Sequence, residues 1–237
     1  MNQHVSASSF NAPRDLWALV PVKRFALAKR RLAPQLSPAE RADLARAMLR
    51  QVLGVLASCR DLSGILVVTS DPEAMALARA FGAHVLPDAV ESGTNAAVRA
   101  GMSALGRAGK GGVIVVPGDV PGIVPAEVEA VIDALAHTPL VLVPAMRDGG
   151  TNLLATCPPD RLAPCFGPSS FARHLEGAHA AGIVPQVLHL PGLGRDIDVS
   201  EDLAALPAAF TPAFFPSRAR PGPVPTLSAP LEEPLPL

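Results

Sequence analysis

The chain has 237 residues, of which 49% are hydrophobic, and its formal net charge is −1. This length and apolar content suffice for one packed α/β domain and exclude global disorder. Lys and Arg together number 20 and Asp and Glu number 21, so no overall basic field exists to bind nucleic acid, and any anion site must be local.

The cysteines and the apolar stretches indicate a compartment. Cys59, Cys157 and Cys165 are an odd set without CxxC spacing, which favours a reducing compartment over a disulfide framework or a zinc knuckle. The N-terminal residues do not resemble a signal peptide, because no basic segment precedes an apolar run. Pro, Gly or a charged residue interrupts each apolar stretch before it reaches membrane-spanning length. We therefore expect a cytoplasmic protein that binds neither membranes nor nucleic acid.

Short apolar runs alternate with helical patterns, which is typical of βαβ units around a largely parallel sheet. Strands are expected at 17–22, 65–69, 84–86, 113–117, 140–144, 151–156 and 186–190. The first helix is expected to begin in a capping box, with Ser37 at the N-cap, Pro38 next and Glu40 two residues later. Further helices are expected from residues 72 and 125, over 94–105 and over 171–181. This order predicts a single α/β domain over residues 16–206.

The two ends of the chain depart from this pattern. Residues 1–15 are expected to form a flexible N-terminus. The segment 207–237 carries nine prolines, few charges and no hydrophobic periodicity. It is therefore predicted to be a mostly disordered tail.

A basic loop follows the first expected strand. It contains five cations within nine residues, namely Lys23, Arg24, Lys29, Arg30 and Arg31. Loops at the carboxyl ends of strands bind ligands in open α/β sheets, and Lys and Arg offset the charge of a triphosphate. The alternative is a solvated basic loop before a helix, and charge alone leaves both interpretations open.

Three aspartates are candidate ligands for a hard cation. Asp119 follows the buried run 113–117, at the carboxyl end of an expected strand. Asp196 and Asp198 would share one face of an extended segment, with Ile197 on the other. Carboxylate oxygens from two segments suit Mg²⁺. The alternatives are that Asp119 is a turn residue and that Asp198 caps a helix starting near residue 200.

Two further loops offer anion sites without cations. The glycine turn 148–152 presents free amide groups and the hydroxyl of Thr151. The segment 166–170 reads as a loop entering a helix, with Ser169 or Ser170 as N-cap, and a helix N-terminus binds phosphate. The alternative is an ordinary capped helix in which His174 is partly exposed. The segment 91–97 would suit contact with a base or ribose and equally a plain turn.

Taken in chain order, these segments resemble one family. They are Val20–Lys23, Lys29–Leu32, Gly93–Ala97, Pro117–Asp119, Gly150–Asn152, Phe166–His174 and Asp196–Leu203. The family is that of the guanylyltransferases that begin the side chain of the deazaflavin coenzyme F-420, acting on 2-phospho-L-lactate, phosphoenolpyruvate or 3-phospho-D-glycerate. The resemblance runs from about Trp17 to Leu206.

The resemblance implies a nucleotidyltransferase-like α/β fold, with a central mixed, mostly parallel sheet flanked by helices. It implies a Mg²⁺ cofactor held by Asp119, Asp196 and Asp198. It implies a site for the phospho-acid formed by Thr151, Gly167 and Ser170.

The same resemblance implies where the nucleotide lies. The triphosphate of GTP would contact the basic loop through Lys23, Lys29 and Arg31. The nucleoside would contact Gly93 and Asn95, and the catalytic groups would be Lys23 and Asp119. GTP and a small phospho-acid are the expected partners, and a homodimer is left open.

Two departures and three alternatives accompany this resemblance. The segment Gly118–Gly122, in which Asp119 is followed by Val120 and Pro121, differs from the more usual Asp-Leu-Pro at this strand end, and the proline-rich tail has no counterpart. A molybdopterin or sugar-phosphate nucleotidyltransferase would open with a glycine-rich loop, whereas this loop is basic and glycine-free. A metal-dependent glycosyltransferase would carry its Asp-x-Asp near mid-chain, and a non-catalytic nucleotide-binding module would need no acceptor pocket. The sequence does not determine which acid is used.

Overall fold

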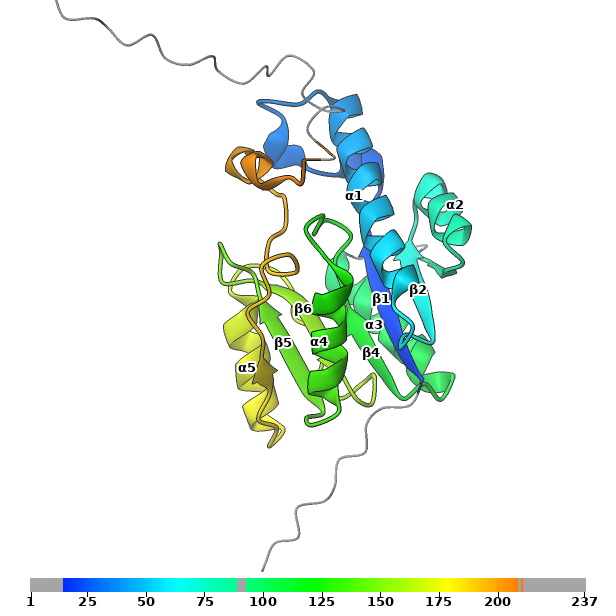
Figure 1. The fold of residues 1–237 in the computed structure, drawn as a ribbon, viewed down its shortest axis with the longest axis vertical. Helices are drawn as coiled ribbons and strands as arrows, with labels where there is room; N and C mark the ends of the chain where they lie inside the picture. Colours follow the sequence, from blue (N-terminus) through cyan, green and yellow to red (C-terminus); the bar gives the residue numbers. More distant parts are fainter. Residues whose placement is uncertain (1–14, 89–92, 209, 211–237) are drawn as a thin grey trace, which may run out of the picture.

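A computed structural model of the protein describes residues 15–88, 93–208 and 210. They form a seven-stranded sheet of order β3-β2-β1-β4-β6-β5-β7 (Figure 1). The strands are β1 Leu16–Val22, β2 Gly64–Thr69, β3 His84–Pro87, β4 Gly112–Val115, β5 Leu140–Pro144, β6 Thr151–Thr156 and β7 Gln186–Val187. Only β6 is antiparallel to its neighbours β4 and β5, and the other pairs are parallel. The expected mixed, mostly parallel sheet is confirmed.

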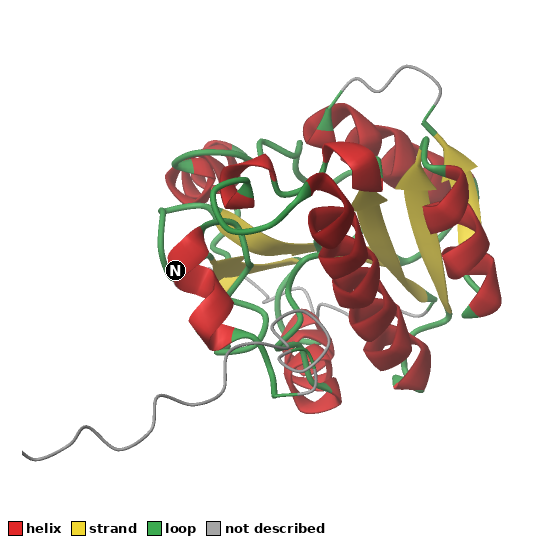
Figure 2. Cartoon of the chain, turned by 90° about the horizontal axis from the view of Figure 1, so that it is seen from above, coloured by secondary structure: helices red, strands yellow, loops and turns green. Residues whose placement is uncertain are grey.

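Helices cover both faces of the sheet (Figure 2). The helices are α1 Pro38–Ser58, α2 Pro72–Ala80, α3 Thr94–Arg107, α4 Pro125–Leu135 and α5 Ser170–Ala180. The capping box at the start of α1 is present, because Ser37 Oγ accepts from Glu40 N–H and Glu40 Oε2 accepts from Ser37 N–H. Three short 3-10 helices, η1 Phe25–Leu27, η2 Arg30–Leu32 and η3 Ser200–Ala205, lie at the end of the sheet where β1 ends.

Two apolar cores sandwich the sheet. Val20 and Ile114 belong to the core shared with α1, α2 and α4, whereas Leu19 and Val115 belong to the core shared with α3 and α5. Neighbouring residues of one strand are thus buried on opposite faces, as expected for strands in a sheet covered on both sides. This explains why the strands appear in the sequence as continuous apolar runs.

A third, smaller core fixes the basic loop and the end of the described chain. Its members are Leu32, Leu36, Leu44, Met48, Ile197, Leu203, Leu206 and Phe210. Figure 1 shows η3 (orange) beside the loops that precede α1 (blue), so segments far apart in the sequence pack together here. Phe210 is buried in this core, which corrects the expected boundary at Leu206.

The N-terminal boundary also differs at one residue. Asp15 accepts hydrogen bonds from Trp17 Nε1 over 2.7 Å and from Lys110 Nζ over 3.0 Å, so it is part of the packed domain. The predictions for residues 1–14 and 211–237 lie outside the described residues. Within the described ranges, no helix is both long and apolar enough to cross a membrane.

Candidate active site

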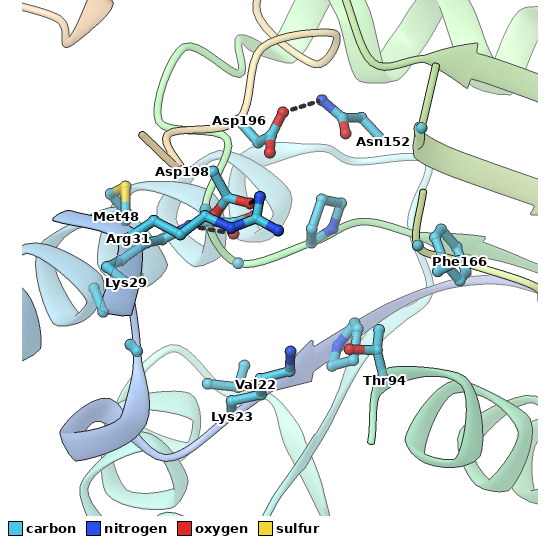
Figure 3. Close-up of a pocket in the computed structure, with 18 of the residues that line it drawn as sticks. Val22, Lys23, Lys29, Arg31, Met48, Thr94, Asn152, Phe166, Asp196 and Asp198 are labelled. Atoms are coloured by element: carbon cyan, nitrogen blue, oxygen red, sulfur yellow. Dashed lines mark hydrogen bonds and ion pairs between the residues drawn. The ribbon is translucent and has the colours of Figure 1, made fainter. Parts of the chain in front are cut away.

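A cavity of about 540 Å³ opens at the carboxyl ends of β1 and β4. Because β6 runs against its neighbours, its first residues, Thr151 and Asn152, reach the same edge of the sheet. In Figure 3, Lys23 and Thr94 lie across the open space from Asp196 and Asn152. The topology therefore brings seven separate segments of the chain to one cavity.

Most of the residues singled out in the sequence line this cavity. They are Lys23, Lys29, Arg31, Asp119, Thr151, Gly167, Ser170, Asp196 and Asp198. Gly93 lines a smaller cavity of about 160 Å³, and Lys23 and Thr94 line both. Asn95 lines neither of these two cavities.

Lys29 lies between two of the three aspartates. Its Nζ donates to Asp119 Oδ2 over 2.5 Å and to Asp198 Oδ1 over 2.8 Å. Its backbone is left-handed with φ of 51°, and its side chain is only 6% exposed. Burial alone would lower the pKa of Lys29, but the two carboxylates outweigh burial and the pKa is raised. The sequence assigned Lys29 to the triphosphate, whereas the structure pairs its ammonium with the carboxylates.

Asp196 completes the acidic group. Burial, and then repulsion from Asp119 and Asp198, raises the pKa of Asp196. Its Oδ1 accepts a hydrogen bond from Asn152 Nδ2 over 3.3 Å. Burial opposes ionisation of Asp198 as well, but the attraction of Lys29 and then of the two nearby arginines prevails and lowers its pKa.

The local backbone explains why both aspartates of the pair face the cavity. Ile197 is buried in the third core and its N–H donates to Asp119 O over 3.2 Å, which joins this segment to the loop after β4. Asp202, not Asp198, accepts from the backbone at the start of η3, at 2.8 Å from Asp198 N and from Val199 N. The interpretation of Asp198 as a helix cap is therefore wrong, and its side chain is turned to the cavity.

The acidic group fits a divalent cation in charge and in ligand type. Three carboxylates and the one buried ammonium of Lys29 sum to −2, and carboxylate oxygens are the ligands that Mg²⁺ prefers. As the side chains stand, no group of three or more His, Cys, Asp or Glu residues within the described ranges is close enough together to hold a metal ion. The ammonium of Lys29 instead supplies the positive charge between Asp119 and Asp198.

A second part of the cavity wall, next to the acidic group, presents hydroxyls. Thr151 and Ser170 are both buried, and Ser170 Oγ lies 3.2 Å from Thr151 Oγ1. The turn into α5 is held by Gly167, whose φ of 122° favours glycine, and by Ser169 in a left-handed conformation. Ser169 occupies the N-cap position, which was one of the two expected alternatives, but its side chain makes no capping hydrogen bond. The expected capping of α5 by a serine hydroxyl is therefore absent.

His174 is a feature that the sequence did not reveal. It is fully buried, which contradicts its interpretation as a partly exposed residue. Its Nδ1 lies 2.9 Å from Thr151 Oγ1, and Cys165 N–H donates to its Nε2 over 3.0 Å. Ser170 and His174 lie four residues apart on α5 and so share one face. That spacing was the available signal.

Two polar side chains support the loops around the cavity. Asn95 Nδ2 donates to Phe166 O over 2.9 Å and Asn95 Oδ1 accepts from Phe166 N–H over 2.7 Å, so its amide holds the 166–170 loop. Contact of Asn95 with the nucleoside stays a prediction. Asp71 Oδ2 accepts from Phe25 N–H over 2.7 Å while Oδ1 caps α2, which anchors the basic loop to β2.

Comparison with known proteins matches the sequence of this domain to one family. The family described as "Guanylyl transferase CofC like" matches residues 16–207. The chain belongs to this family. A related protein from Conexibacter woesei, named phosphoenolpyruvate guanylyltransferase, is 38% identical over 80% of this chain and 86% of its own length.

Other relatives carry names with different acids. The 2-phospho-L-lactate guanylyltransferase of Methanothermobacter thermautotrophicus is 34% identical over 80% of this chain and 82% of its own length. The 3-phospho-D-glycerate guanylyltransferase of Phenylobacterium zucineum is 37% identical over 78% and 86%. Membership of the family favours a guanylyltransferase over the glycosyltransferase and molybdopterin alternatives.

Solved structures agree with the fold at low sequence identity. A putative nucleotide-diphospho-sugar transferase from Desulfovibrio desulfuricans has a TM-score of 0.66 and 18% identity, with 82% of this chain and 87% of that chain covered. A 4-diphosphocytidyl-2C-methyl-D-erythritol synthase from Anaerococcus prevotii has a TM-score of 0.60 and 13% identity, with 84% and 96% covered. The nucleotidyltransferase fold expected from the resemblance is confirmed.

Proposed function

We propose that the protein transfers GMP from GTP to a three-carbon phospho-acid and releases pyrophosphate, as a step of coenzyme F-420 biosynthesis. The observation that carries this proposal is that two kinds of group line one cavity. Asp119, Asp196 and Asp198 form its acidic end, and the Thr151 and Ser170 hydroxyls form a neighbouring, uncharged end. One end suits a nucleotide with its cation, and the other suits a phosphate that arrives without one.

Each end of the cavity has a separate task in the reaction. Mg²⁺, held by the three aspartates, would neutralise charge on the phosphates of GTP. Lys23 lies at the end of β1, lines both cavities and makes no ion pair with the described residues, so its ammonium is available to the triphosphate. The smaller cavity beside Gly93 and Thr94 would take the nucleoside.

The acceptor phosphate is the nucleophile. One of its oxygens attacks the α-phosphorus of GTP, a new P–O–P bond forms, and the bond to the β-phosphate breaks as pyrophosphate leaves. A phosphate monoester is ionised at neutral pH, so the site requires no general base. The protein contributes by holding the two phosphates in line and by stabilising charge in the transition state.

The experiment is a pyrophosphate-release assay with GTP, Mg²⁺ and each of 2-phospho-L-lactate, phosphoenolpyruvate and 3-phospho-D-glycerate. We expect release with at least one acid and none when the acid is omitted. Substitution of CTP for GTP tests the nucleotide. Absence of release with all three acids would overturn the proposal. A cytoplasmic location agrees with the free thiols of Cys59, Cys157 and Cys165.

A further inference from the structure

His174 lies behind the Thr151–Ser170 end of the cavity, and both nitrogens of its ring are engaged. Its Nδ1 contacts Thr151 Oγ1 at 2.9 Å and its Nε2 accepts from Cys165 N–H over 3.0 Å. The Phe166 ring packs against it edge-on, with centroids 5.3 Å apart. The residue is completely buried, so these contacts fix the orientation of the ring.

The contact with Cys165 determines which ring nitrogen carries the proton. A backbone N–H can only donate, so Nε2 accepts and is unprotonated. A neutral imidazole then carries its proton on Nδ1, which donates to Thr151 Oγ1 at 2.9 Å, with the backbone carbonyl of Ser170 as a second acceptor. Burial, and then repulsion from Arg173, lowers the pKa of His174 to about 4, so the ring is neutral at physiological pH.

This fixed proton determines what the two hydroxyls offer to a ligand. Thr151 Oγ1 accepts from His174, and one of the two hydroxyl hydrogens lies between Thr151 and Ser170. Neither hydroxyl has another hydrogen-bond partner in the described part of the chain, so the second hydrogen is available to the cavity that both residues line. With the proton on Nε2 instead, Thr151 would donate to the ring, Ser170 would donate to Thr151, and no hydrogen would remain for a ligand.

We propose that His174 is a positioning residue whose Nδ1–H sets the Thr151–Ser170 pair as a hydrogen-bond donor toward the phosphate of the acid. The inference rests on the proposed function, because it takes the ligand at this end to be the phospho-acid. A hydrogen bond to a charged phosphate is stronger than one between neutral groups, so the direction of this one hydrogen affects acid binding. His174 does not itself line the cavity and has no contact with the reacting atoms.

Two variants of the same residue separate positioning from packing. His174→Asn places an amide nitrogen near the position of Nδ1, so it keeps a donor for Thr151 and loses the acceptor for Cys165 N–H. His174→Gln places an amide oxygen near the position of Nε2, so it keeps the acceptor and loses the donor. His179→Gln makes the same chemical change on the exposed face of α5 and is the matched control.

The readout is the Michaelis constant for each substrate, with the melting temperature of each variant. We expect His174→Gln to raise KM for the phospho-acid by about tenfold or more, and His174→Asn to keep it within about threefold of wild type. KM for GTP is expected to stay within about threefold in both, and His179→Gln to match wild type. In a Thr151→Val background, His174→Gln should add no further loss of acid affinity.

Equal changes in acid KM for the two His174 variants, or equal changes in KM for acid and GTP, would overturn the inference. Nitrogen-15 NMR of histidine-labelled protein tests it without turnover: the resonance missing from His174→Asn should be that of a neutral, Nδ1-protonated ring, and an Nε2-protonated ring would refute the argument. If wild type releases no pyrophosphate with any acid, the proposed function fails, whereas active wild type with indistinguishable His174 variants fails this inference alone.

Discussion

Thr151→Val tests the acceptor end of the cavity with the smallest change in shape. Valine matches threonine in size but lacks the hydroxyl, which is buried between His174 and Ser170. The substitution therefore removes one hydrogen-bonding group at the cavity wall and leaves β6 and its register intact. It also removes the Thr151 acceptor of His174 Nδ1–H.

Two separate magnitudes follow from this geometry. A hydrogen bond to a charged group contributes about 1.5–3 kcal/mol, so KM for the phospho-acid should rise by roughly 10- to 150-fold. Loss of this acceptor costs at most about 3 kcal/mol of stability, the cost of leaving a buried donor unsatisfied. For a domain of this size, the melting temperature should fall by roughly 2–4 °C for each kcal/mol lost.

The assay is steady-state pyrophosphate release with each substrate varied in turn, beside a thermal melt. Thr151→Ser is the matched control, since it keeps the oxygen that accepts from His174 and should retain both acid affinity and most of the stability. KM for GTP should hardly change in either variant. If Thr151→Val weakens GTP binding and spares the acid, the two ends of the cavity are reversed and the assignment fails.

Four further predictions address the rest of the molecule. Asp119→Asn should reduce kcat with Mg²⁺ on the order of 100-fold and, because it removes one of the two carboxylates beside the buried Lys29 ammonium, should also lower the melting temperature; an unchanged rate would refute the metal assignment. Lys23→Ala should raise KM for GTP and reduce kcat more than Arg30→Ala does, because Lys23 directly follows β1. Equal effects of the two substitutions would indicate that the basic loop attracts GTP only through its summed positive charge. Phe210→Ala should cost about 3 kcal/mol of unfolding free energy in urea, and no change would show that its burial is unimportant. As pH falls from about 6.5 to 4, the unfolded state binds a proton at His174 that the native state excludes, so the free energy of unfolding should drop by about 3 kcal/mol. His174→Asn should remove this pH dependence of the unfolding free energy, as measured by urea titrations at each pH.

The sheet was predictable from the sequence because of how its strands are buried. Helices cover both faces, so runs such as 113–117 are continuously apolar and stand out from the amphipathic helices. The helix starts were marked by caps such as Ser37 and Asp71, which bond as expected. The last strand was overpredicted: Val187, Leu188 and Leu190 make 186–190 resemble a strand, but β7 pairs only over Gln186–Val187.

The site was predictable in its residues and less so in their contacts. Strand ends indicate where Asp119 and Lys23 lie, but hydrophobic periodicity does not show strand direction, so the reversal of β6 that brings in Asn152 was not visible. Lys29 pairs with Asp119, which lies 90 residues further along the chain, and with Asp198, which lies 169 residues further along. Such contacts depend on the packed third core and not on any local pattern.

The charge difference between the two ends of the cavity explains how one site can hold two anionic substrates apart. A phospho-acid without a cation is repelled by the acidic end, where the Lys29 ammonium and the more exposed Arg31 only partly offset three carboxylates. The Thr151–Ser170 end does not repel an anion, because it offers neutral donors and the amino-terminal end of α5, where the helix dipole favours a phosphate. GTP binds more favourably beside Lys23 and the aspartates than at the Thr151–Ser170 end. Its higher negative charge is offset there by the Lys23 ammonium and by the Mg²⁺ that the aspartates would hold. His174 is consistent with this division, because a buried, neutral imidazole adds a hydrogen bond to the acceptor end without adding charge.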